Sequence, residues 1–181
     1  MVPASFWLLM IPVATWVVSG AQVSPTLIVI CSGAKAILDV PKTVEHLETL
    51  GMPVIGYETD EFPAFFTRSS GIKLEVTASS PEEAVKIAKA HWAAGNGTAI
   101  VLAVPVPEEA ELSRVEVEAA LAEALAEAER SHISGKAITP FLLSQMENLT
   151  AGRSLKANVA LLLNNAVVAA KVSVVLANAD R

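Results

Sequence analysis

The strongest constraint on the fold is an apolar, largely β-branched run that ends in three small residues and a lysine. Residues 27–31 read Leu-Ile-Val-Ile-Cys, and Ser-Gly-Ala and then Lys35 follow. Four or five apolar residues bounded by a small-residue turn predict a buried strand. Gly33 tolerates a positive φ angle, so the backbone can bend closely after the strand. We therefore expect Lys35 to stand just beyond the carboxyl end of a buried strand.

Strand-like and helix-like patterns alternate along the rest of the chain. The sequence predicts strands at 27–31, 52–57, 72–76 and 98–106, and helices at 36–50, 80–94, 112–130, 139–149 and 155–178. Ser80-Pro81-Glu82-Glu83 is a capping box that starts the second helix, and Thr139 followed by Pro140 predicts another N-cap. This alternation predicts an α/β protein with three layers, α/β/α, around a largely parallel or mixed sheet.

Lys35 has two interpretations when only the residues around it are considered. Open α/β sheets bind ligands at the carboxyl ends of their strands, and a lysine held against an apolar sheet edge has a lowered pKa. A neutral amine in that position is a candidate nucleophile. Alternatively, Lys35 opens the next helix with its amine in water. The pattern alone leaves both open.

Two further stretches have both a functional and a structural interpretation. Residues 58–71 mix acids with three phenylalanines and end in Arg-Ser-Ser-Gly. A loop of this length in a compact domain is often functional, but its phenylalanines can also pack back or meet a neighbouring subunit. Asn158 and Asn165 share one face of the last helix, where they either join a core network or orient a substrate hydroxyl.

Composition excludes several classes of function. The net charge is −6, which argues against nucleic acid and acidic membrane surfaces as partners. Cys31 is the single cysteine, so the chain has no internal disulfide and fits a reducing compartment. The three histidines lie far apart, without zinc-ligand spacing. Neither a Walker A motif nor a Gly-x-Gly-x-x-Gly opening a helix is present.

The first 26 residues differ from the rest of the chain. Phe6 to Val18 is almost wholly apolar and is followed by Ser19-Gly20-Ala21, which resembles the apolar part of a signal peptide without its basic flank. The stretch is too short to span a bilayer as a relaxed helix. A buried segment, or sequence added by an unusual start site or gene model, is the alternative.

Several long motifs, in order, resemble pseudouridine-5′-phosphate glycosidase, also called the indigoidine synthase A-like family. They are Cys-Ser-Gly-Ala-Lys-Ala-Ile-Leu-Asp (31–39), Leu-Glu-Thr-Leu-Gly-Met-Pro-Val-Ile-Gly-Tyr (47–57), Thr-Asp-Glu-Phe-Pro-Ala-Phe (59–65), Arg-Ser-Ser-Gly (68–71), Gly-Lys-Ala-Ile-Thr-Pro-Phe-Leu-Leu (135–143), Leu-Thr-Ala-Gly-Arg-Ser-Leu-Lys-Ala-Asn (149–158) and Asn-Asn-Ala (164–166).

The resemblance implies an enzyme, a glycosidase or lyase that reversibly cleaves the C–C glycosidic bond of pseudouridine 5′-phosphate to uracil and ribose 5-phosphate. It further implies a homotrimer and a manganese requirement. Lys35 matches the lysine that forms an imine with the opened ribose, and Asn158 matches the asparagine beside the uracil. These expectations make Lys35 a catalytic nucleophile, whereas its local pattern alone left that role open.

The resemblance covers residues 27–181, which correspond to the C-terminal part of the family, whereas residues 1–26 are unrelated to it. We therefore expect an incomplete domain. The family's proton-donor glutamate, phosphate-binding lysine and metal-binding aspartate lie upstream of the nucleophile, where residues 1–34 have no charged side chain. The expected manganese ligand is thus missing from this chain. The alternative function is a truncated, non-catalytic derivative that acts only as an oligomerisation fragment. We expect a cytoplasmic location, or a secretory or membrane-associated one through residues 6–21.

Overall fold

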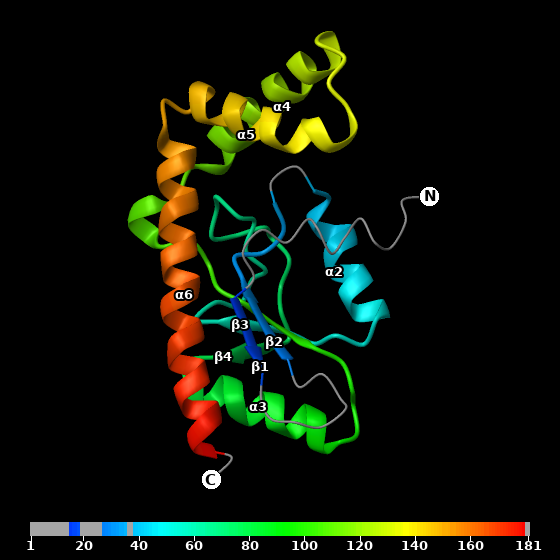
Figure 1. Cartoon of the computed structure of the whole chain (residues 1–181), viewed down its shortest axis with the longest axis vertical. Coiled ribbons are helices and arrows are strands. Elements are labelled where there is room, and N and C mark those ends of the chain that lie inside the picture. Colours follow the sequence, from blue (N-terminus) through cyan, green and yellow to red (C-terminus); the bar gives the residue numbers. More distant parts are fainter. Residues whose placement is uncertain (1–14, 19–26, 36–37, 180–181) are drawn as a thin grey trace.

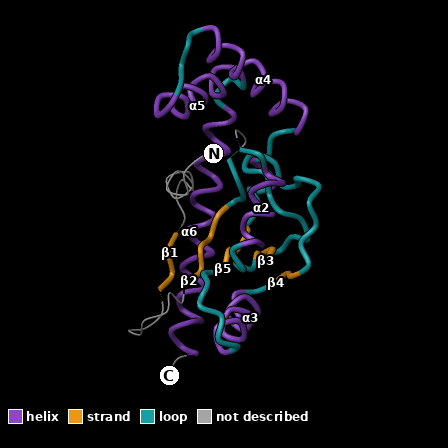
Figure 2. Tube along the Cα trace, turned by 90° about the vertical axis from the view of Figure 1, so that its right-hand side faces the viewer, coloured by secondary structure: helices purple, strands orange, loops and turns teal. Residues whose placement is uncertain are grey.

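The computed structural model describes residues 15–18, 27–35 and 38–179. It contains a five-stranded sheet in the order β1-β2-β5-β3-β4, which Figure 2 shows from the side. The strands are β1 (Thr15–Val18), β2 (Leu27–Cys31), β3 (Val54–Tyr57), β4 (Val76–Ala78) and β5 (Ile100–Ala103). β1 pairs antiparallel with β2, whereas the other neighbours run parallel. The sheet is therefore mixed and largely parallel, as predicted.

The apolar run 27–31 is confirmed as a central strand. In β2, Ile28 and Ile30 are buried, and Ile30 lies opposite the equally buried Leu102 of β5. A strand flanked on both sides and covered on both faces favours such a continuous apolar run. Of the apolar stretch 6–18, only β1 lies within the described residues, and Ser19-Gly20-Ala21 lies outside them.

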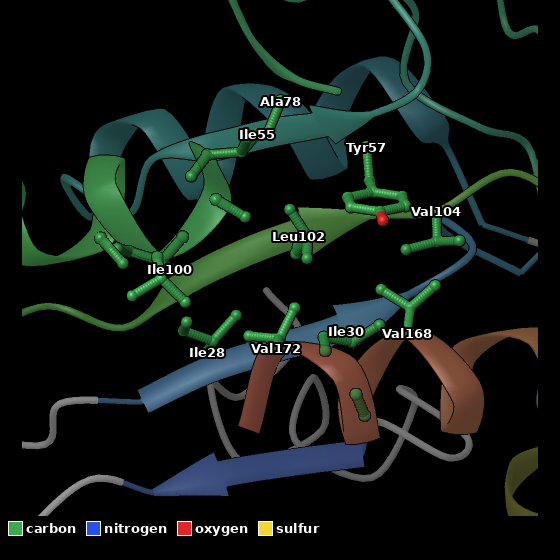
Figure 3. Close-up of a cluster of buried hydrophobic side chains, with 14 of the residues drawn as sticks. Ile28, Ile30, Ile55, Tyr57, Ala78, Ile100, Leu102, Val104, Val168 and Val172 are labelled. Carbon is green, nitrogen blue, oxygen red and sulfur yellow. The ribbon is translucent and has the colours of Figure 1, made fainter. Parts of the chain in front are cut away.

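Helices cover both faces of the sheet (Figure 1), which confirms the three-layer α/β/α prediction. α3 (Pro81–Ala93) and α6 (Arg153–Ala179) pack on one face, and α2 (Val40–Thr49) packs on the other. Figure 3 shows Val168 and Val172 of α6 against the buried side chains of the sheet. The main core therefore lies between the sheet and α3 and α6.

Two more helices lie beyond the carboxyl ends of the parallel strands, at the top of Figure 1. α4 (Arg114–Arg130) and α5 (Ile138–Leu149) pack on each other through Ala124, Ala128 and Leu142. A second apolar cluster, which includes Phe66, Met146 and Leu161, connects them to the loop 58–71 and to α6. α4 and α5 therefore lie over the carboxyl ends of the parallel strands, where Lys35 is expected.

Four predicted boundaries are wrong. The strand expected at 72–76 begins only at Val76, because Lys73 pairs with Glu61 and the Leu74 N–H donates to the Asp60 carbonyl. The strand expected at 98–106 covers only β5. The helix expected from residue 36 begins at Val40, since the Asp39 carboxylate caps it by accepting from the Lys42 N–H.

The fourth wrong boundary is the N-cap expected at Thr139. A short 3₁₀ turn, η2 (Gly135–Ala137), leads directly into α5, which therefore begins at Ile138. Pro140 then falls in the first turn, where its missing N–H removes no helical hydrogen bond. The capping box at Ser80 is confirmed as a helix start, because its Oγ accepts from the Glu83 N–H at 3.2 Å.

α6 is unusual because it is apolar on both faces. Its 27 residues are long and apolar enough to cross a membrane by length and composition, although core helices of soluble proteins also meet these criteria. One face lies in the core, and the other exposes Leu155, Val159, Leu163, Val167 and Val174. We call these five residues the outer ridge. A helix with apolar residues all round is normally covered all round.

The two faces of α6 give a matched test of the fold. Val172→Ala removes a side chain that is fully buried, so we expect the free energy of unfolding in urea to fall by about 2 kcal/mol. Val167→Ala makes the same chemical change where 52% of the residue is exposed, and we expect a loss below about 0.5 kcal/mol. Equal losses would show that α6 is oriented differently.

Candidate functional site

The turn 32–35 lies at the carboxyl edge of the sheet, between β2 and α2. The Val104 N–H donates to the Cys31 carbonyl at 2.8 Å, so β2 stays attached to the chain leaving β5 up to its last residue. The Leu38 N–H donates to the Lys35 carbonyl at 2.8 Å and closes the turn. The turn therefore starts and ends at fixed points.

Gly33 is required by the close approach of the loop 58–71. Its φ angle is +82°, which favours glycine, and a Cβ added there would lie 1.7 Å from the Pro63 carbonyl oxygen. Gly33 forms an isolated bridge with Ala64, and the Phe65 N–H donates to the Ser32 carbonyl at 3.0 Å. The loop backbone thus lies directly against the lysine turn.

The loop 58–71 owes its position to its aromatic side chains. Phe62, Phe65 and Phe66 are all buried, and the rings of Phe65 and Phe66 meet edge to face at 4.8 Å between centroids. The interpretation that the phenylalanines pack back onto the chain is therefore confirmed. Arg68 also holds the loop to the segment after β5, because its guanidinium donates to the Val106 carbonyl at 2.7 Å.

Lys35 is buried, with 8% of its surface exposed, so the alternative that places it in water is wrong. Within the described part of the chain it forms no ion pair, and burial alone lowers the pKa of its amine. Burial acts in the opposite direction on its neighbour, since it raises the pKa of the Cys31 thiol to about 11. At neutral pH the thiol is therefore protonated and a poor nucleophile, which leaves the lysine as the candidate.

α6 connects to the lysine turn through Asn165 rather than through Asn158. The Ser32 hydroxyl donates to Asn165 Oδ1 at 3.2 Å, and both residues are buried. Asn158 lies two turns earlier on the same face and is half-buried, but no described contact joins it to Lys35. The interpretation of Asn165 as a core network group is confirmed, and the role of Asn158 stays a prediction.

Sequence patterns could not predict the contacts around the turn. Asn164 donates through Nδ2 to the Pro105 carbonyl at 3.3 Å, and the approach of Pro63 to Gly33 joins segments far apart in sequence. The one available signal was the adjacent pair of amides in an otherwise apolar helix, since buried amides require partners.

A small cavity lies near the turn, and the described residues contain no metal site. The cavity, of about 220 Å³, lies between the start of α2, the loop 58–71 and α4, and its lining includes Thr67 and Arg114 but neither Lys35 nor Asn158. Residues 15–18, 27–35 and 38–179 contain no group of three His, Cys, Asp or Glu side chains able to hold a metal ion. The described residues therefore do not supply a manganese site.

Fold and site together define a class: an α/β protein that buries a lysine just past the carboxyl end of a parallel strand. The family described as Indigoidine synthase A like protein matches residues 22–175. The chain therefore belongs to the indigoidine synthase A-like family.

Relatives and solved structures agree with this assignment. The chain is 53% identical over 148 residues to a pseudouridine-5′-phosphate glycosidase from Caldanaerobacter subterraneus, covering 82% of this chain and 48% of the relative. It is 51% identical over 152 residues to the glycosidase of the same name from Myxococcus xanthus, covering 84% and 50%. The chain thus spans about half the length of the curated relatives it matches.

Two solved structures share the fold. The prealnumycin C-glycosynthase AlnA, in complex with ribulose 5-phosphate, is 36% identical with a TM-score of 0.77, over 85% of this chain and 51% of that one. An indigoidine synthase A-like protein from Thermotoga maritima is 39% identical with a TM-score of 0.72, over 81% and 48%. The described residues therefore represent about half of the family fold.

Glycine substitutions test the packing of the loop on the lysine turn. Gly71 has a φ angle of +81° but open space around it, so Gly71→Ala should lower the free energy of unfolding by about 1 kcal/mol through backbone strain. Gly33→Ala adds a clash with Pro63 at nearly the same φ, and we expect about 1–3 kcal/mol more. Equal losses in urea unfolding would contradict the close approach.

Proposed function

We propose that this chain carries the nucleophile of a pseudouridine-5′-phosphate glycosidase, which reversibly converts pseudouridine 5′-phosphate and water to uracil and ribose 5-phosphate. The observation that carries the proposal is the burial of Lys35 at the carboxyl edge of the sheet, without an ion pair among the described residues. The names of the curated relatives and the sugar phosphate bound to the glycosynthase support the choice of substrate.

The placement of Lys35 suits the chemistry of a C-glycoside. The base is attached through carbon, so no leaving heteroatom can be protonated, and an electron sink is needed at C1′. Lys35 Nζ bonds to C1′ while the bond from C1′ to the ring oxygen breaks, and that oxygen takes up a proton. The C1′–C5 bond then breaks as the nitrogen lone pair forms the iminium, and its electron pair stays with uracil, which is protonated. Water hydrolyses the imine to ribose 5-phosphate and the free amine.

A lowered pKa supports this role because only the neutral amine can attack C1′. Burial lowers the pKa of Lys35 below its ordinary value of 10.5, so a larger fraction of the amine is neutral near pH 7 than in an exposed lysine. Asn158 is proposed to lie on the uracil side, on the basis of the family motif alone. Manganese is given no step here, since the described residues do not fit a site for it.

We further propose that the protein works as an oligomer, as the homotrimer of the family implies. The outer ridge of α6 supports assembly, because it presents a row of exposed leucine and valine side chains along a long helix. The second candidate function is a non-catalytic derivative that serves only in assembly. It is favoured by the exposed outer ridge, which suits assembly whether or not the chain is catalytic.

Trapping of the imine tests the role of Lys35. Incubation with ribose 5-phosphate and borohydride should attach the reduced sugar to Lys35, and mass spectrometry of the peptide locates it. Lys35→Gln should abolish this adduct, whereas Lys156→Gln, at an exposed position on α6, should leave it unchanged. Because the pKa is lowered, adduct formation should persist at a lower pH than labelling of exposed lysines. A folded wild-type chain without an adduct would contradict the proposal.

Turnover separates the two candidate functions. We expect the isolated chain to form the Lys35 adduct but to condense uracil with ribose 5-phosphate poorly, even with manganese, because it matches only 48% of the length of the Caldanaerobacter relative. The measurement is pseudouridine 5′-phosphate formed per hour, with the intact Caldanaerobacter relative as the reference. Robust turnover would remove the non-catalytic candidate, whereas loss of both adduct and turnover would leave it as the function.

A further inference from the structure

Adjacent asparagines on α6 bind two different segments of the chain at the carboxyl edge of the sheet. Asn164 Nδ2 donates to the Pro105 carbonyl, in the segment that follows β5. Asn165 Oδ1 accepts from the Ser32 hydroxyl, in the turn that follows β2. β2 and β5 are neighbours in the sheet, so Asn164 and Asn165 together bind the two segments that follow these strands.

The contact with Ser32 lies in the interior of the protein. Asn165 is 1% exposed and Ser32 is 2% exposed, and the partners are 133 residues apart in sequence. A buried amide is costly in an apolar helix unless it is hydrogen-bonded, so an apolar residue would pack more easily at position 165. The presence of an amide at position 165 is therefore explained by its hydrogen bond with Ser32 rather than by packing.

Asn165 completes the support of the lysine turn. Backbone hydrogen bonds hold the rest of the turn. The Phe65 N–H donates to the Ser32 carbonyl, the Val104 N–H to the Cys31 carbonyl and the Leu38 N–H to the Lys35 carbonyl. Among these described contacts, the hydrogen bond between the Ser32 hydroxyl and Asn165 is the one made by side chains, and it connects the turn to α6. Side-chain ties of this kind hold reacting groups within narrow geometric limits.

We infer that Asn165 is a positioning residue for Lys35. Through its hydrogen bond with Ser32 it fixes the turn 32–35, so that the lysine amine stays buried at the carboxyl edge of the sheet. The inference deepens the proposed function, on which it rests for the identity of the reaction. The placement of the amine, however, can be measured without any substrate.

The experiment compares Asn165→Leu, Ser32→Ala and the double variant with Asn148→Leu, which changes an exposed asparagine on α5 as the control. The first readout is the rate of borohydride-trapped adduct formation with ribose 5-phosphate. The second is the pH midpoint at which Lys35 is labelled by acetic anhydride, measured by mass spectrometry with the Lys156 peptide as an internal reference. The groups described against the turn from the loop 58–71, the segment after β5 and α6 are Phe65, Val104 and Asn165, which do not titrate.

We expect each single variant to slow adduct formation by about 10- to 100-fold, because a misplaced nucleophile loses rate even when it is present. The labelling midpoint of Lys35 should move upward, because a released turn lets water reach the amine and removes the effect of burial on its pKa. The double variant should match the singles, since both side chains act through one bond. Asn148→Leu should change neither readout.

Two results would overturn the inference. One is an unchanged rate and midpoint in a variant that circular dichroism shows to be folded, and the other is a double variant whose effects are the sum of the singles. If Asn165→Leu does not fold, Ser32→Ala, which removes a single oxygen, carries the same test. If the wild-type chain forms no adduct, the proposed function fails while the labelling midpoints still decide whether Asn165 positions Lys35.

Discussion

The close approach of the Pro63 carbonyl to Gly33 is the constraint on which the candidate site depends. Residue 33 must lack a side chain and must take a positive φ angle, and both conditions are set by the loop lying against it. The loop can lie there because three phenylalanines anchor it in the interior. A packing feature of the loop therefore decides where the lysine turn lies and how little water reaches it.

The sheet and α6 provide the rest of the framework. β2 ends in the turn and β5 runs beside it, so the carboxyl edge forms where the two central strands finish. α6 packs its buried face on the strands. Its Asn164 and Asn165 bind the segments that follow β5 and β2. This is the edge at which open α/β sheets place their ligands, so the topology brings Lys35 to this edge, and the loop 58–71 and α6 hold the turn there.

Much of this could be predicted from the sequence, and the successes and failures have physical causes. The continuous apolar run of β2 and the capping box at Ser80 are local signals, and both were confirmed. The strand expected at 72–76 failed because Lys73 and Leu74 find partners in the loop 58–71, which no local pattern reveals. Local pattern left the burial of Lys35 open and gave no partner for Asn165, because both arise from contacts between segments distant in sequence.

The role proposed for Lys35 requires that burial lower the pKa of its amine. A ¹³C NMR titration of the lysine Cε signals measures this directly, with Lys35→Gln used to assign the resonance. We expect Lys35 to titrate below the ordinary lysine value of 10.5, because burial lowers the pKa of its amine. A midpoint for Lys35 at or above 10.5 in the folded chain would contradict it.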